Sequence, residues 1–172
     1  LLEYRMTSQL NVDDIRPKAG SGSISLAFYA EAASQYTITA NTYVQNTVLT
    51  DNEIDTHSAF ASSKFTVPTD YAGLYMLYYV AYIDFDGIGD DGKFARSAIY
   101  KNGVAIANHD ITDNSAADIL SVSVAVSTMA NLSAGDEITF YNRASDASGS
   151  NPTVQGNNIS GGYTFCYGYR IV

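Results

Sequence analysis

The chain has 172 residues, of which 46% are hydrophobic and 16% are charged, so it can bury the core of one globular domain and is not expected to be intrinsically disordered. Nine Lys and Arg stand against eighteen Asp and Glu, a formal net charge of -9, which disfavours nucleic acid as a partner because phosphate binding needs a basic surface. No apolar run approaches the roughly 20 residues that a membrane helix needs, and the single cysteine, Cys166, excludes an internal disulfide, so we expect neither membrane insertion nor a disulfide framework.

The first 45 residues are the least regular part of the sequence. A few apolar residues precede Pro17, and a glycine- and serine-rich stretch follows it. This composition predicts an N-terminal arm or linker over residues 1–45 and a head domain over residues 46–172. Within the first part, residues 27–34 are expected to form a short helix. Because the opening lacks the charged and apolar regions of a signal peptide, we expect Met6 to be the natural start, or the chain to be a fragment or a processing product.

The segment from Leu74 to Phe85 predicts a strand with two apolar faces. Alternate residues place one set on each face: Tyr75, Leu77, Tyr79, Ala81, Ile83 and Phe85 on one, and Leu74, Met76, Tyr78, Val80 and Tyr82 on the other. A strand of this kind needs an apolar cover on both sides. Two covers are open for the second face: a neighbouring subunit, or a second sheet or loop of the same chain.

Four aspartates lie at the end of this segment and just after it: Asp84, Asp86, Asp90 and Asp91. Carboxylate oxygens are the ligands that Ca²⁺ prefers, so this loop is a candidate Ca²⁺ site, the only cofactor that the sequence suggests. The alternative is a solvated acidic loop that protects a sheet edge. The glycines at 87–92 match a dinucleotide-binding pattern, but the aspartates among them and the strand expected next argue against a pyrophosphate site.

The rest of the chain alternates with a period of two. Asn102-Gly103 predicts a two-residue hairpin turn between strands over residues 97–107. Residues 120–127 alternate leucine and valine with serine and alanine, residues 138–141 form the next alternating segment, and residues 163–169 place an aromatic residue at every second position. Since a period of 3.6 is nearly absent, the sequence predicts an all-β domain whose last strand is part of a sheet.

No residue pattern indicates catalysis. The chain lacks a G-x-S-x-G elbow, and its two histidines, His57 and His109, are expected to be structural. Paired carboxylates for glycoside hydrolysis stay open, because such pairs form only in space. Fourteen Tyr and no Trp suit either a recognition surface or a core. We therefore expect a protein that is not an enzyme.

Five sequence blocks resemble, in the same order, the globular head of complement C1q and the tumour necrosis factor superfamily. They are Phe65–Pro68, Ala72–Tyr75, Ile99–Gly103, Leu132–Asp136 and Ser160–Tyr163. The resemblance implies an antiparallel jelly-roll sandwich of about ten strands that assembles as a homotrimer around an aromatic axis and binds partners. The residues expected at the trimer interface are Tyr75, Tyr78, Tyr79, Tyr82, Tyr163 and Tyr167.

Residues 8–22 resemble the opening of many tailed-phage fibre and appendage proteins. The matching residues, expected to attach the arm to other virion proteins, are Val12, Ile15 and Pro17. Together the two resemblances imply a trimeric fibre or appendage head on the virion surface. We expect such a head to bind a host-surface glycan or protein through the loops at 84–92 and 146–158. The alternatives are a capsid decoration protein, a secreted cytokine-like or complement-like binding module, and an enzyme acting on surface polysaccharide.

Overall fold

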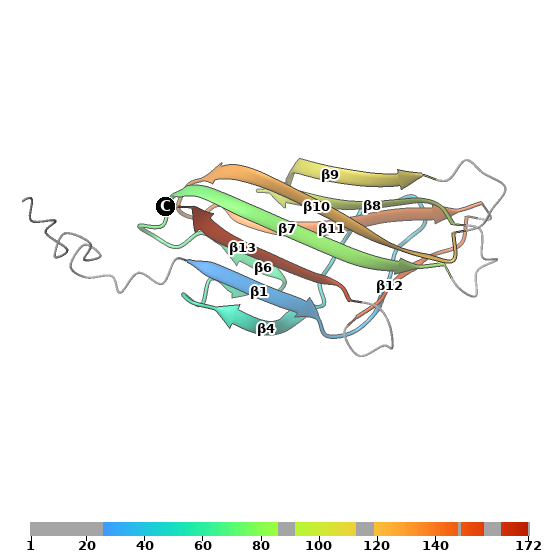
Figure 1. The fold of residues 1–172 in the computed structure, drawn as a ribbon, viewed down its shortest axis with the longest axis horizontal. Coiled ribbons are helices and arrows are strands. Elements are labelled where there is room, and N and C mark those ends of the chain that lie inside the picture. Colours follow the sequence, from blue (N-terminus) through green and yellow to red (C-terminus); the bar gives the residue numbers. More distant parts are fainter. Residues whose placement is uncertain (1–25, 86–91, 113–118, 148, 157–162, 172) are drawn as a thin grey trace, which may run out of the picture.

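The computed structural model describes residues 26–85, 92–112, 119–147, 149–156 and 163–171, and this part of the chain is all-β (Figure 1). Its strands form two antiparallel sheets, one behind the other in Figure 1. In chain order they are β1 (Ala27–Ala32), β2 (Tyr36–Thr37), β3 (Val44–Gln45), β4 (Leu49–Asp55), β5 (Phe60–Ala61), β6 (Lys64–Thr66), β7 (Gly73–Asp84), β8 (Gly92–Lys101), β9 (Val104–Thr112), β10 (Ser121–Leu132), β11 (Glu137–Asp146), β12 (Thr153–Val154) and β13 (Phe165–Ile171).

The first sheet, sheet A, is built around β7. Its strands run in the order β2-β12-β7-β13-β1-β4, and β10 pairs with β7 along the length of that strand. The C-terminal strand β13 lies between β7 and β1, which confirms the expectation that the last strand is part of a sheet. Non-local pairing of this kind brings both ends of the described chain to the centre of one sheet.

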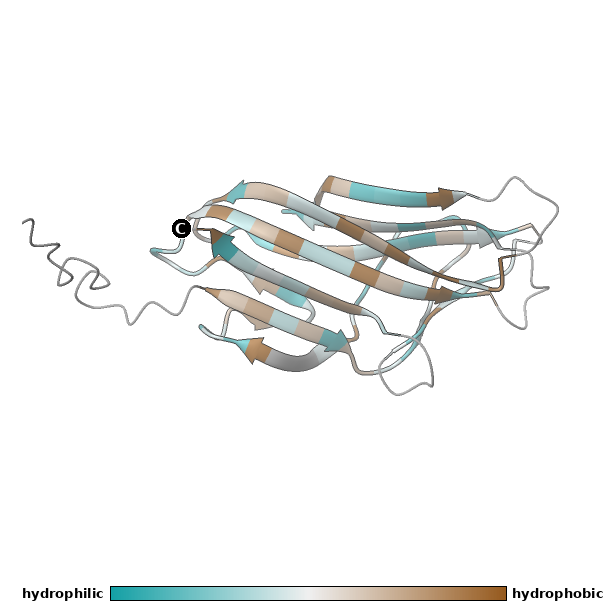
Figure 2. Ribbon diagram, viewed as in Figure 1, coloured by the Kyte–Doolittle hydropathy of each residue, from teal (hydrophilic) through white to brown (hydrophobic). Residues whose placement is uncertain are grey.

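The second sheet, sheet B, has the order β5-β6-β11-β8-β9, with β3 also paired to β11. The predicted hairpin joins β8 to β9. Asn102 and Gly103 have φ angles of 51° and 79°, the positive values that a two-residue turn of this type needs and that Asn and Gly tolerate. Figure 2 shows hydrophobic residues recurring along β7 and β10 and a hydrophilic middle of β9.

The core fills the space between the two sheets. Alternate side chains of β7 are fully buried there, together with inward-facing residues of β1, β6 and β11. Phe28 stacks on Phe65 with ring centroids 4.5 Å apart and on Phe60 at 5.1 Å, while Tyr79 packs against Phe140 at 5.1 Å. These aromatic contacts join the sheets into one sandwich.

A buried polar network also joins the sheets. The hydroxyl groups of Tyr36 and Tyr79 both donate to Asn142 Oδ1, whose Nδ2 donates to Ser97 Oγ at 3.0 Å. Asn46 Nδ2 donates to the Tyr79 hydroxyl at 3.1 Å. Burial raises the pKa of both tyrosines well above the ordinary value, so these hydroxyl groups stay neutral and keep their protons for the network.

Two expectations about the first 45 residues need correction. The predicted helix at 27–34 is wrong, because β1 is a strand whose alternate residues Phe28, Ala30 and Ala32 are buried; its alanines suit a helix, but its period of two suits a sheet. Residues 27–45 also contribute three strands to the two sheets, so the head begins before residue 46. Residues 1–25 lie outside the described residues, and an arm formed by them stays a prediction.

Candidate functional site

The two apolar faces of β7 meet different surroundings. The side chains of Tyr75, Leu77 and Tyr79 point into the core and are fully buried. The alternate side chains point to the outer face of sheet A, where Leu74 is 36% exposed and Met76 and Tyr78 are half-buried. No strand of the described chain lies over this outer face (Figure 1). The cover that the second face needs is therefore not supplied by a strand of the described part of the chain.

An aromatic ladder crosses the middle of this outer face. Tyr167 of β13 is the direct register partner of Tyr29 in β1 and of Tyr78 in β7. Phe165 lies two residues before Tyr167 on β13. Tyr78 stacks on Tyr167 with centroids 4.8 Å apart and on Phe165 at 5.8 Å, and Tyr29 lies 5.5 Å from Phe165. The register of three neighbouring strands thus places four rings on one surface.

Exposed apolar side chains surround the aromatic ladder. On the same face, Met129 is 64% exposed, Ile54 is 50% exposed and Tyr169 is 44% exposed. Met129 is the register partner of Met76, and Ile54 is that of Tyr29, which places both beside the ladder. A contiguous apolar surface of this kind is typical of an interaction site.

The tyrosine hydroxyl groups on this face are partly paired within the chain. The Tyr29 hydroxyl donates to Glu31 Oε1 at 2.5 Å, and that of Tyr82 donates to Ser121 Oγ at 2.8 Å. Burial, and to a smaller extent the neighbouring Tyr167, raises the pKa of Tyr78. The aromatic rings of the ladder therefore carry no charge at ordinary pH, and the carboxylate beside them, Glu31, accepts a hydrogen bond from the Tyr29 hydroxyl.

The structure separates the six tyrosines predicted at a trimer interface. Tyr75 and Tyr79 are fully buried in the core of one chain. Their prediction as trimer-interface residues is therefore corrected, because the predicted set combined residues from both faces of one strand. Tyr78, Tyr82 and Tyr167 lie on the outer face as half-buried residues. Tyr163 is 64% exposed just before β13.

Sequence reasoning missed several residues of this surface. Strand pairing brings Tyr29, Ile54 and Met129 to the ladder. A local sequence pattern does not predict which residues of two paired strands lie opposite each other. Tyr29 had one signal, the alternation in residues 27–32, but it lies in the segment that was expected to form a helix. Phe165 and Tyr169 alternate with Tyr167 in the sequence and could have been included on that basis.

The predicted Ca²⁺ ligands lie mostly outside the described residues. Asp86, Asp90 and Asp91 are not described, while Asp84 Oδ2 accepts a hydrogen bond from Gln155 Nε2 at 2.8 Å. Within the described ranges, no group of three or more His, Cys, Asp and Glu side chains is placed to hold a metal ion. The Ca²⁺ site stays a prediction. The predicted attachment residues also fall outside the described part: Val12, Ile15 and Pro17.

Both histidines make contacts that suit a structural role. The His57 ring packs on Tyr71 with centroids 4.4 Å apart, and its Nδ1 lies 2.8 Å from Thr56 Oγ1. His109 Nδ1 lies 2.8 Å from the main-chain oxygen of Ala125.

The part of the chain that the structure describes contains no helix with the length and apolar character needed to cross a membrane.

The comparisons with known proteins rest on structure alone. No protein-family model and no curated protein matches the sequence. Among solved structures, the tumour necrosis factor Eiger from S. frugiperda matches with a TM-score of 0.62 and 12% identity over 86% of this chain and 93% of that chain. The fold is a tumour necrosis factor-like jelly roll. The predicted fold class, an all-β antiparallel jelly-roll sandwich, is thereby confirmed.

Two further structures agree with this assignment. Murine APRIL matches with a TM-score of 0.58 and 13% identity, covering 84% of this chain and 98% of that chain. The globular domain of zebrafish complement 1qA matches with a TM-score of 0.54 and 15% identity, covering 85% of this chain and 97% of that chain. At such low identity the likeness establishes the fold.

Proposed function

We propose that the chain is a non-enzymatic extracellular binding module that assembles as a homotrimer through the outer face of sheet A. The exposed aromatic and apolar surface of that face carries the proposal, because each Å² of apolar surface left in water costs about 25 cal/mol. The fold supports it, since the resemblance to the tumour necrosis factor superfamily and to C1q heads implies homotrimers that bind partners.

The side chains on this face suit a contact between copies of the chain. Protein interfaces are enriched in Tyr and Met, and charged residues are depleted at their centres. The aromatic ladder would lie at the centre of the contact, with Leu74, Met129 and Tyr169 around it. In a cyclic trimer each copy turns this face toward the symmetry axis, so the aromatic ladder of every copy is removed from water.

A binding role is also favoured over catalysis by the fold. The similar structures are a tumour necrosis factor, APRIL and a complement domain. These findings favour the cytokine-like or complement-like module, one of the sequence-based alternatives, over the tail-fibre head. The virion role depends on residues 8–22, which lie outside the described residues, and no comparison supports it. The virion-surface head stays a second candidate, favoured by the sequence of residues 8–22 alone.

A charge placed on the outer face of sheet A tests the assembly. Met129→Glu changes a side chain that is 64% exposed, so the fold of one chain should survive while the apolar contact between copies is lost. Val104→Glu is the matched control, because Val104 is 67% exposed but begins β9 in sheet B. We expect light scattering after size exclusion to give a trimer for the wild type and the control and a monomer for Met129→Glu. Trimers in both variants would show that this face is not the interface.

A further inference from the structure

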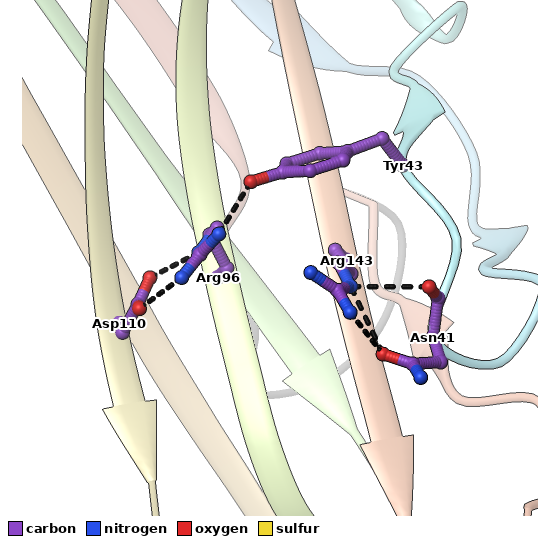
Figure 3. A network of polar contacts seen from close by, with 5 residues as sticks. All are labelled: Asn41, Tyr43, Arg96, Asp110 and Arg143. Carbon is purple, nitrogen blue, oxygen red and sulfur yellow. Dashed lines mark hydrogen bonds and ion pairs between the residues drawn. The ribbon is translucent and has the colours of Figure 1, made fainter.

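Two arginines face each other on the outer side of sheet B, the layer opposite the proposed trimer contact. Arg96 of β8 and Arg143 of β11 are direct register partners, and Figure 3 shows them side by side on the two strands. Like charges directly opposite each other on a sheet are destabilising. The pair therefore lowers the stability of the fold unless anions neutralise both guanidinium groups.

One carboxylate neutralises only part of this charge. Asp110 of β9 pairs with Arg96 through two hydrogen bonds (Figure 3). Arg143 instead donates to the neutral acceptors of Asn41: Nε to the main-chain oxygen and to Oδ1, each at 3.0 Å, and Nη2 to the same Oδ1 at 2.5 Å. Among the described residues, no carboxylate forms an ion pair with Arg143. The cluster keeps an excess positive charge in a chain whose net charge is -9.

Aromatic rings hold both guanidinium groups in place. The ring centroids of Tyr43 and Phe94 lie 5.8 and 5.2 Å from Arg96 Cζ, and 5.6 and 5.4 Å from Arg143 Cζ. The Tyr43 hydroxyl also accepts a hydrogen bond from Arg96 Nη1 at 2.6 Å. Cation–π contacts on these rings restrict the arginine rotamers, so less entropy is lost when a ligand binds.

Further tyrosines extend the surface beside the arginines. The Tyr100 ring lies 4.2 Å from that of Tyr141 and 6.0 Å from that of Tyr43, measured between centroids. The Tyr141 hydroxyl donates to Gln45 Oε1 at 3.3 Å. These rings are half-buried, so each presents both apolar carbon and a polar hydroxyl edge to a ligand.

We propose that Arg96, Arg143, Tyr43 and Phe94, together called the arginine cradle, bind the carboxylate of an acidic saccharide. A guanidinium group binds a carboxylate through two parallel hydrogen bonds, and the excess charge on Arg143 supplies the attraction. The tyrosines alongside favour a saccharide over a simple anion, because a sugar ring stacks on an aromatic face while its hydroxyl groups pair with polar edges. The inference names a ligand for the proposed binding module. It rests on that function in one respect, because the outer side of sheet B must stay accessible in the proposed trimer.

Calorimetry on the full chain tests the arginine cradle. The probe is an oligosaccharide of galacturonate, and its methyl ester is the control ligand because it keeps the sugar and loses the charge. We expect binding of the acid only, weakened as salt rises. Arg143→Gln should lower the affinity about tenfold or more, the usual effect of losing hydrogen bonds to a charged group. Lys64→Gln is the matched variant, since it removes one positive charge from an exposed ion pair elsewhere in sheet B.

A second variant separates loss of binding from loss of folding. Asp110→Asn removes the carboxylate that occupies Arg96, so it should raise the affinity for galacturonate, a gain that a misfolded chain does not show. Absence of binding in the wild type while its trimer mass is intact would overturn the cradle and leave the proposed function standing. Equal binding of the methyl ester, or binding only of a sulfated saccharide or a glutamate-rich peptide, would overturn the assignment to a sugar carboxylate.

Discussion

Asn142 satisfies two buried hydroxyl groups with one side chain. Its Oδ1 accepts from Tyr36 and Tyr79, and its Nδ2 donates to Ser97 Oγ and to the main-chain oxygen of Arg96. The residue sits on β11 in sheet B, whereas Tyr79 belongs to β7 in sheet A. The network thus fixes the two sheets against each other while leaving none of its own polar atoms unpaired.

The replacement Asn142→Leu leaves the hydroxyl groups of Tyr36 and Tyr79 without their acceptor in the core. Each orphaned group costs about 1–3 kcal/mol, so we expect the free energy of unfolding to fall by roughly 2–6 kcal/mol in urea denaturation. Asn108→Leu is the control, because Asn108 is exposed on β9 and a surface change of this kind stays within about 0.5 kcal/mol. Equal losses in the two variants would refute a structural role for the network.

Tyr75 makes stability depend on alkaline pH. Burial raises the pKa of its hydroxyl to about 12 from an ordinary value of 10.0, and the hydroxyl donates to the main-chain oxygen of Tyr71 at 2.6 Å. The unfolded chain releases this proton first, so the stabilisation is fully present below pH 10 and is lost as the pH rises toward 12. We expect the free energy of unfolding to fall between about pH 10 and about pH 12, less steeply in Tyr75→Phe. An identical slope in that variant would contradict the assignment.

At the level of strands, the sequence predicted the elements with clear alternation and missed those that depend on pairing. The two-faced strand β7, the Asn102-Gly103 hairpin and the final strand β13 all follow from local patterns. The helix expected at 27–34 was wrong, because residues 27–32 alternate between buried and half-buried positions with the period of two that a strand has. Of the aromatic ladder, only Tyr78 and Tyr167 were predicted, and the pair Arg96–Arg143 was not, since residues about fifty positions apart meet only through register.

Gly168 shows how closely β13 packs on the core. A Cβ added there would lie 2.6 Å from Phe28 Cε1 and 2.9 Å from Leu77 Cδ2. We expect Gly168→Ala to destabilise the fold by roughly 1–3 kcal/mol through overpacking, measured by urea denaturation. Combining it with Phe28→Leu should recover part of the loss relative to the sum of the two single changes. Strict additivity would mean that the clash with Phe28 is not the cause.

On the scale of the whole molecule, the two outer faces of the sandwich have different chemistry. The outer face of sheet A is mostly apolar around the aromatic ladder, while that of sheet B carries the arginine cradle. Association through the first face leaves the second accessible on each copy. The two proposals thus assign one face to assembly and the other to a ligand.

Salt should act in opposite directions on these two faces. Chains of net charge -9 repel one another, so screening by added salt is expected to strengthen the association through sheet A. The same screening should weaken the binding of galacturonate to the arginine cradle. Sedimentation and calorimetry at about 0.05 and about 0.3 M salt measure the two effects. A parallel response of both would show that one of the faces is misassigned.

The mass of the full chain in solution tests the central claim most directly. One chain has a mass of 18.5 kDa, and sedimentation equilibrium gives the mass of the assembly without reference to its shape. We predict three times the chain mass, persisting on dilution to low micromolar concentration. A stable species of 18.5 kDa would contradict the account, because the outer face of sheet A would then be an exposed apolar surface without a partner copy.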